Sequence, residues 1–317
     1  MKRRVLATVM AAGMILACSL PAAAADNLTL ATGGTTGTYY AVGGVLATVL
    51  NPVLENSNIT VTSTGASKAN IQLIDDEDAD LALVQNDVMY YAYTGTDVFE
   101  GEGAYDTFSA VAALYEETVQ IVTCDPSIET VADLAGKSVS VGDAGSGTEF
   151  NAKQILAAYD LSFDDIKPVN ASFGDSADSL KDGKIDAAFV VAGAPTTAVV
   201  DLGTVKDVKL VQLDDEHIEK LQSDYDFYTK TVIPADTYKG VGETTAVSVK
   251  ATLIASNDVS EDAVYELLAA MFDNQDDLIN GHDKFSLLNL EDAVAGISVP
   301  FHAGAQKYYE EQGITIE

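Results

Sequence analysis

The feature that most constrains the fold is an alternation of apolar runs with helical patterns, which occurs twice along the chain. The apolar runs 28–31, 59–63 and 81–84 are each followed by a stretch with the spacing of a helix. The same order of strand, Gly-rich loop and helix returns in residues 138–159. Such alternation favours parallel strands joined by crossover helices. We therefore predict an α/β fold with two lobes, each a mostly parallel sheet flanked by helices.

The two halves also correspond in their spacing. Asp80 and Asp186 each stand between a helix end and an apolar strand, and they lie 106 residues apart. Thr38 and Thr148 follow the two Gly-rich loops and lie 110 residues apart. This nearly constant offset predicts a duplicated unit. The alternative is a shared α/β pattern without duplication.

The pattern changes after Lys230. A longer strand is predicted over 245–255, and an amphipathic helix follows it. Its apolar face, which we assign to the core, carries Val264, Leu267, Leu268, Met271 and Phe272. A chain that builds two lobes and then returns to the first can close them around a cleft. We predict that lobe 1 comprises residues 26–115 and 245–317, and lobe 2 residues 116–244.

Residues 1–25 have the pattern of a secretory signal peptide. Three basic residues precede an apolar run, and small residues offer a cleavage site before Asp26. Processing as a lipoprotein at Cys18 is an alternative, but no Gly/Ser tether follows it. We favour cleavage after Ala25 and an extracytoplasmic, periplasmic location. Cys124 is then the only thiol, so an internal disulfide is excluded.

The charge of the mature chain argues against several partners. Loss of residues 1–25 removes three of the 17 basic residues, including both arginines, and leaves 14 lysines against 49 acidic residues, a net charge of −35. Nucleic acid and anionic membranes repel such a surface. The acidic run 75–80 lacks the glycine of a calcium loop, and no zinc or dinucleotide motif occurs. We predict no metal, no cofactor and no nucleic-acid partner.

The two Gly-rich loops are the candidate binding site. Ligands of α/β sheets bind beyond the carboxyl ends of the strands, where helices begin with free amides and a partial positive charge. Residues 33–38 and 145–148 supply glycines that permit close approach and hydroxyls that donate hydrogen bonds. Two such helix starts facing one another would bind an anion without arginine. The alternative is that both loops are only tight turns.

Other polar residues have two interpretations each. Gln85, Asn86 and Asp87 follow the strand 81–84 and either face the cleft or cap the next helix. Lys68 is the lysine best placed to help hold an anion, or is simply solvated. Ser146 could be a hydrolase nucleophile, but it lacks the glycines of the G-x-S-x-G motif.

Seven segments in fixed order carry a resemblance to a known family. They are "TGGTTGTYYAVGG", "ADLALVQNDV", "LYEETVQIV", "VADLAGKSVSVGDAGSGTEFNA", "AAFVVAGAPT", "FYTKTVIPADTY" and "VPFHAGAQKYYEEQG". The chain resembles the TAXI family of solute receptors, which serve TRAP-type (tripartite ATP-independent periplasmic) transporters. The resemblance implies a two-lobed periplasmic-binding-protein fold of type II character and a monomer without enzymatic activity. It implies capture of a small organic anion, such as glutamate, glutamine or a dicarboxylate, and delivery to a TRAP membrane permease.

The resemblance also implies a set of ligand-binding residues. These are Gly34, Thr36, Tyr39, Thr64, Gln85, Asn86, Ser146, Gly147 and Thr148. Asn86 departs from the serine that is usual there, which would change pocket size and donor pattern. Two other functions stay open at this point: an exported hydrolase using Ser146, and a ligand-sensing module for a membrane kinase.

Overall fold

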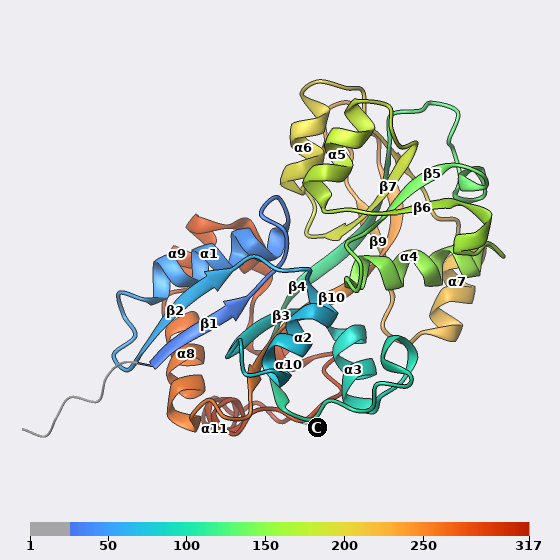
Figure 1. Cartoon of the computed structure of the whole chain (residues 1–317). Coiled ribbons are helices and arrows are strands. Elements are labelled where there is room, and N and C mark those ends of the chain that lie inside the picture. Colours follow the sequence, from blue (N-terminus) through green and yellow to red (C-terminus); the bar gives the residue numbers. More distant parts are fainter. Residues whose placement is uncertain (1–25, 317) are drawn as a thin grey trace, which may run out of the picture.

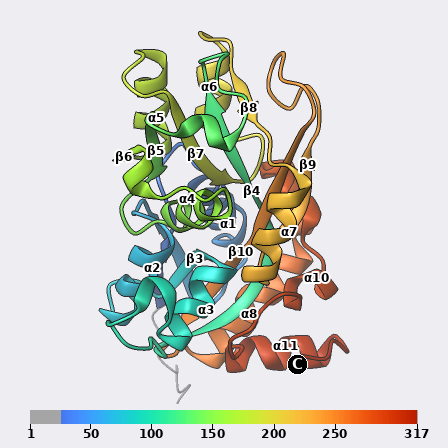
Figure 2. The same cartoon turned by 90° about the vertical axis from the view of Figure 1, so that its right-hand side faces the viewer.

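The computed structural model describes residues 26–316, so the predicted signal peptide and Cys18 lie outside the described residues. Two lobes are visible in both views of the molecule (Figures 1 and 2). They share one mixed sheet with the strand order β2-β1-β3-β10-β4-β7-β5-β6, to which β8 adds on β4 and β9 on β10. The predicted two-lobed α/β class is confirmed.

Lobe 1 begins with three strand-to-helix units. Its elements are β1 (Asp26–Ala31), α1 (Thr38–Leu50), β2 (Ser57–Thr62), α2 (Ser67–Asp75), β3 (Leu81–Gln85), α3 (Asn86–Thr94) and the short 3-10 helix η1 (Asp97–Phe99). The C-terminal part of the chain returns to this lobe with α8 (Glu261–Asp273), α9 (Gln275–Gly281), η4 (Asp283–Leu287), α10 (Leu290–Val294) and α11 (Ala303–Glu311). Strands β1, β2 and β3 are parallel to one another.

Lobe 2 repeats the arrangement. Its elements are η2 (Val131–Leu134), β5 (Ser138–Gly142), α4 (Gly147–Ala158), η3 (Phe163–Asp165), β6 (Lys167–Asn170), α5 (Phe173–Lys181), β7 (Ala187–Ala192), α6 (Thr197–Gly203), β8 (Lys209–Val211), α7 (Asp215–Asp224) and β9 (Thr229–Ile233). Strands β5, β6 and β7 are parallel. Figure 2 shows α5 and α6 at the far end of this lobe from α8 and α11.

Two long antiparallel strands, β4 (Phe108–Thr123) and β10 (Thr244–Ser256), pass through both lobes. β10 pairs with β9 of lobe 2 through 244–248 and with β3 of lobe 1 through 251–255. β4 pairs with β7 of lobe 2 from Thr118 onward. The lobes therefore meet near residues 115–118 and 248–251. The predicted boundary at 245 falls earlier than this point, because the first residues of β10 still belong to the sheet of lobe 2.

The buried apolar residues divide in the same way. One cluster fills lobe 1, and two clusters cover the two faces of the lobe 2 sheet. On α8, the side chains of Val264, Leu267, Leu268 and Met271 are buried, whereas Phe272 packs at the edge of the core. The predicted face of this helix thus lies against lobe 1.

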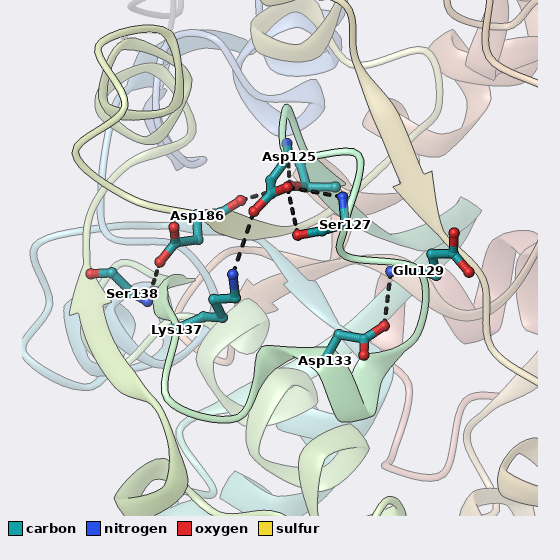
Figure 3. Close-up of polar contacts among 8 residues, drawn as sticks. Asp125, Ser127, Glu129, Asp133, Lys137, Ser138 and Asp186 are labelled. Carbon is teal, nitrogen blue, oxygen red and sulfur yellow. Dashed lines mark hydrogen bonds and ion pairs between the residues drawn. The ribbon is translucent and has the colours of Figure 1, made fainter.

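One contact recurs in the two lobes and supports the duplication. The carboxylate of Asp80 accepts a hydrogen bond from the Thr29 amide of β1 at 2.7 Å. That of Asp186 accepts one from the Ser138 amide of β5, also at 2.7 Å (Figure 3). Figure 3 also shows the ion pair of Asp125 with Lys137, 3.4 Å long, beside the turn that leads toward β5. Each aspartate ties the start of its strand to the first strand of the lobe.

Two features are absent from residues 26–316. None of the helices there has the length and apolar character needed to span a membrane. No group of His, Cys, Asp and Glu in the same range is arranged to hold a metal ion.

Candidate functional site

A small cavity lies where the two lobes meet. Its walls come from the starts of α1, α2, α4 and α5, the end of β3, the crossing point of β4, and β7. The residues are Gly33, Gly34, Gly37, Thr38, Tyr39, Ala66, Ser67, Gln85, Glu117, Asp143, Ser146, Gly147, Thr148, Phe173, Val191 and Ala192. Helix starts carry partial positive charge, and none of these described residues is Lys, Arg or His.

The lobe 1 loop leads into α1 with little help from side chains. The N-cap residue Gly37 is extended, and no side chain of the described part of the chain caps the first turn. The Thr38 hydroxyl instead reaches lobe 2, where it donates to the carbonyl oxygen of Gly193 at 3.1 Å. The Tyr39 hydroxyl donates to the carboxyl group of Glu117 at 2.6 Å. The first-turn amides of α1 are thus left for water or a ligand.

The lobe 2 loop satisfies more of its own backbone. The Ser146 hydroxyl accepts a hydrogen bond from the Glu149 amide at 3.2 Å, and the Glu149 carboxylate accepts one from the Gly145 amide at 2.7 Å. Gly142 turns the chain at φ +93°, and a Cβ there would lie 2.7 Å from the Ser146 Oγ. A Cβ on Gly147 would lie 1.8 Å from Gln85 Oε1 of lobe 1. Only glycine at 147 lets the two lobes approach this closely.

Six of the nine residues proposed from the resemblance line the cavity. They are Gly34, Tyr39, Gln85, Ser146, Gly147 and Thr148. The sequence placed the two loops on opposite sides of a cleft, and the structure brings them into one cavity.

The other three lie elsewhere. Thr36 packs beside Gly174 in a separate surface hollow. The Thr64 hydroxyl donates to the carbonyl oxygen of Thr32 at 2.9 Å, within lobe 1. The Asn86 side chain turns toward β10, where its Oδ1 accepts from the Lys250 amide at 2.9 Å. Backbone groups already pair the polar atoms of Thr64 and Asn86, so those two side chains serve loop and strand contacts.

Lys68 also points away from the cavity. Its ammonium group donates to the carbonyl oxygen of Val98 at 2.9 Å and pairs with the Glu102 carboxylate at 2.5 Å. Its aliphatic stem lies near Gly145, since a Cβ there would be 3.9 Å from it. The bonds from Lys68 to the Val98 carbonyl and the Glu102 carboxylate hold η1 and the loop after it against α2. Lys68 therefore supplies no charge to the cavity wall.

Glu117 is a buried acidic residue of the cavity wall that sequence reasoning missed. It is 2% exposed and lies on β4 at the crossing between the lobes. Burial raises the pKa of its carboxyl group to about 8, while the hydrogen bond from Tyr39 acts in the opposite direction. An acidic residue inside the strongly apolar run 108–123 was a signal that could have identified it.

Several polar contacts hold the lobes together beside the cavity. Asn151 of α4 donates to the carboxyl group of Asp87 on α3 at 3.0 Å, and its amide nitrogen also lies 2.7 Å from the Tyr228 hydroxyl. Burial raises the pKa of Asp87 to about 6. The Lys284 ammonium group, from η4, donates to the carbonyl oxygen of Ala194 in lobe 2 at 2.6 Å. The lobes are therefore in direct contact through α3 and α4 and through η4 and the segment after β7.

With this geometry in place, comparison with known proteins identifies the family. The profile of the NMT1-like family matches residues 30–313, nearly the whole described chain. The chain belongs to the NMT1-like family.

Solved structures share the fold of this NMT1-like chain at low sequence identity. A Bordetella bronchiseptica protein is 16% identical, with 91% of this chain and 89% of that chain covered and a TM-score of 0.52. A Listeria monocytogenes protein described as a candidate L-cystine ABC transporter is 17% identical, with 82% and 95% covered and a TM-score of 0.51. The periplasmic aliphatic sulphonate binding protein of Escherichia coli is 15% identical, with 90% and 83% covered and a TM-score of 0.47.

Proposed function

We propose that this NMT1-like protein is an extracytoplasmic solute receptor, not an enzyme. It captures a small carboxylate-bearing solute between its lobes and delivers it to a membrane permease. The observation that carries this proposal is that loops of both lobes place the N-terminal ends of helices at one cavity between the lobes. Backbone amides and hydroxyls there can hold a carboxylate in the absence of arginine. The family match and the shared fold support the same function.

Closure of the lobes is the second part of the proposal. A ligand that contacts α1 and α4 together binds the closed form more strongly than the open form, and so shifts the population toward closure. Thr38 and Gly147 already contribute contacts across the interface. The TRAP type of the permease and the preference for glutamate, glutamine or dicarboxylates come from the resemblance to TAXI receptors.

A hydrolase that uses Ser146 is less well supported. The Ser146 hydroxyl serves as the N-cap acceptor of α4, and no histidine lines the described cavity. The ring of His302 lies 3.0 Å from the carbonyl oxygen of Val259, and the ring of His217 stacks on Tyr159. A serine without an adjacent base is a weak nucleophile.

Calorimetric titration of the mature chain tests the receptor function. We expect at least one solute among glutamate, glutamine, 2-oxoglutarate and succinate to bind. Gly147→Ala should weaken that binding more than tenfold, because its methyl group would displace Gln85. Gly44→Ala is the matched control: this position on α1 faces open space, so affinity should not change. Failure of a broad panel of organic anions to bind would contradict the proposal.

A further inference from the structure

The cavity holds acceptors as well as donors, and this narrows the class of solute. This inference rests on the proposed receptor function. Besides hydroxyl groups, three side chains in the wall carry carboxyl or amide oxygens: Gln85, Glu117 and Asp143. Cationic side chains are missing from the described wall, so no side-chain cation there pairs with these oxygens. A solute that brings its own positive charge would do so.

Gln85 points to such a solute independently of the acidic residues. Its side chain is 2% exposed, lies in the cavity wall and packs against Gly147. Its Oε1 atom is buried and has no hydrogen-bond partner among the described residues. Buried amide oxygens are almost always paired, and leaving one unpaired is unfavourable. A donor on the bound solute would pair it.

Glu117 lies next to Gln85, whose side chain also acts on its carboxyl group as a hydrogen-bond partner and lowers its pKa. Tyr39 donates to its Oε2 at 2.6 Å, which leaves acceptor capacity on the carboxyl group. Its backbone lies in β4, which pairs with β10 at the lobe crossing, so the sheet holds this position at the boundary between the lobes. We propose that Glu117, together with Gln85 Oε1, binds a protonated amine of the solute, so that the receptor selects an amino acid over the corresponding dicarboxylate or keto acid.

A zwitterion carries both groups that this wall would pair. The carboxylate of an amino acid would lie on the helix-start amides, and its ammonium group would lie on Gln85 and Glu117. A dicarboxylate would instead direct its second carboxylate toward Glu117 and Asp143, with no cation between them. Glu117 is thus a specificity-determining residue. It is ionised when an amine is bound and protonated when a second carboxylate is bound.

Proton linkage makes this distinction measurable. Titratable groups around Glu117 are Tyr39 on α1, Asp87 on α3, Tyr115 and Glu116 on β4, Lys250 beside Glu116 on β10, and Asp143 in the cavity wall. Burial, with repulsion from Asp87 and Glu116, raises the pKa of Glu117 to about 8, so the empty site is mostly protonated at pH 7. An ammonium group favours the carboxylate and would lower that pKa.

Amino-acid binding at pH 7 should therefore release close to one proton. Affinity for the amino acid should rise as the pH increases from 6 to 8 and then level off. A keto acid or dicarboxylate requires Glu117 to stay protonated. Its affinity should be steady below pH 8 and should fall above it.

The experiment is calorimetric titration of the mature chain with common amino acids, each paired with its 2-oxo acid, in two buffers of different ionisation enthalpy. We expect an amino acid to bind at least tenfold more tightly than its 2-oxo acid and to release a proton. Glu117→Gln should weaken binding of the amino acid by at least about 30-fold and remove the proton release. It should change the affinity for the keto acid by less than threefold. Glu116→Gln is the matched control, since the neighbouring carboxyl group lies outside this cavity, and it should leave both affinities within about threefold.

The outcomes separate this inference from the receptor function. If 2-oxo acids or dicarboxylates bind as tightly as amino acids, or if Glu117→Gln retains amino-acid affinity, the receptor function holds and the inference is overturned. If none of the solutes binds, both are overturned. The proton count needs only the wild-type chain, so failure of Glu117→Gln to fold leaves the inference testable, and an amino acid that binds without proton release overturns it.

Discussion

The loops that lead into α1 and α4 occupy equivalent places in the two lobes but satisfy their backbones differently. The segment from Thr29 to Gly37 has the same length as that from Ser138 to Ser146, and each ends at a helix N-cap. Ser146 and Glu149 complete the loop of lobe 2 with side-chain hydrogen bonds. The loop of lobe 1 ends at Gly37, which has no side chain to contribute.

This difference separates two tasks that a duplicated unit can perform. In the loop of lobe 2, the side chains of the loop and of the first turn of α4 already pair backbone amides, so its shape does not depend on a ligand. The start of α1 keeps free donors, so a bound carboxylate would be held mainly by lobe 1, with Ser146, Gly147 and Thr148 closing over it. The comparison between the two loops can be tested by substitutions at equivalent positions.

The largest contrast is expected at the first glycine of each loop. Gly142→Ala should lower the free energy of unfolding by about 3 kcal/mol, because alanine at positive φ is strained and its Cβ would overlap Ser146 and Thr148. The equivalent Gly33→Ala should cost less than about 1 kcal/mol, since its Cβ would have ordinary contacts at 3.7 Å. Urea unfolding of both variants measures the difference. Equal losses would show that the two loops are under the same constraint.

The two duplicated aspartates should contribute equally to the free energy of unfolding, although each substitution is expected to cause a substantial loss. Asp80→Ala and Asp186→Ala should each cost about 2 kcal/mol, because each leaves an amide of the first strand without its charged acceptor. Chemical denaturation of the two variants, with the same probe, tests whether the duplicated aspartates stabilise their lobes equally. A loss at only one of them would mean that the shared contact is a coincidence of pattern.

The duplicated loops and aspartates were predictable because their spacing is local and repeats. The offset predicted a duplicated unit, and the Gly-rich segments predicted two helix starts. The placement of Asn86 was not predictable, because its side chain bonds to β10, which lies more than 160 residues further along the chain. The extent of lobe 2 into β10 could not be read either, since a strand that continues through both lobes shows no change of composition at the crossing.

The cavity itself shows the same limit. Glycines and hydroxyls at helix starts indicate where an anion could bind, and six of the nine proposed residues do line the cavity. Glu117 was overlooked because its importance depends on the position where β4 crosses between the lobes. A local pattern identifies helix starts, but the meeting of two lobes determines which residues between them become the wall.

The smallest effect is expected at the N-cap of α4. Ser146→Ala should cost about 1 kcal/mol, because the Glu149 amide loses its acceptor. Ser146→Gly places in lobe 2 the residue that lobe 1 has at Gly37, and it should cost only a few tenths of a kcal/mol because glycine is itself a tolerated N-cap. Thermal unfolding of the two variants provides the measurement. If Ser146→Ala is as stable as the wild-type protein, the hydroxyl does not stabilise the turn, and the two loops differ in geometry alone, which would remove the energetic reason for assigning the carboxylate mainly to α1.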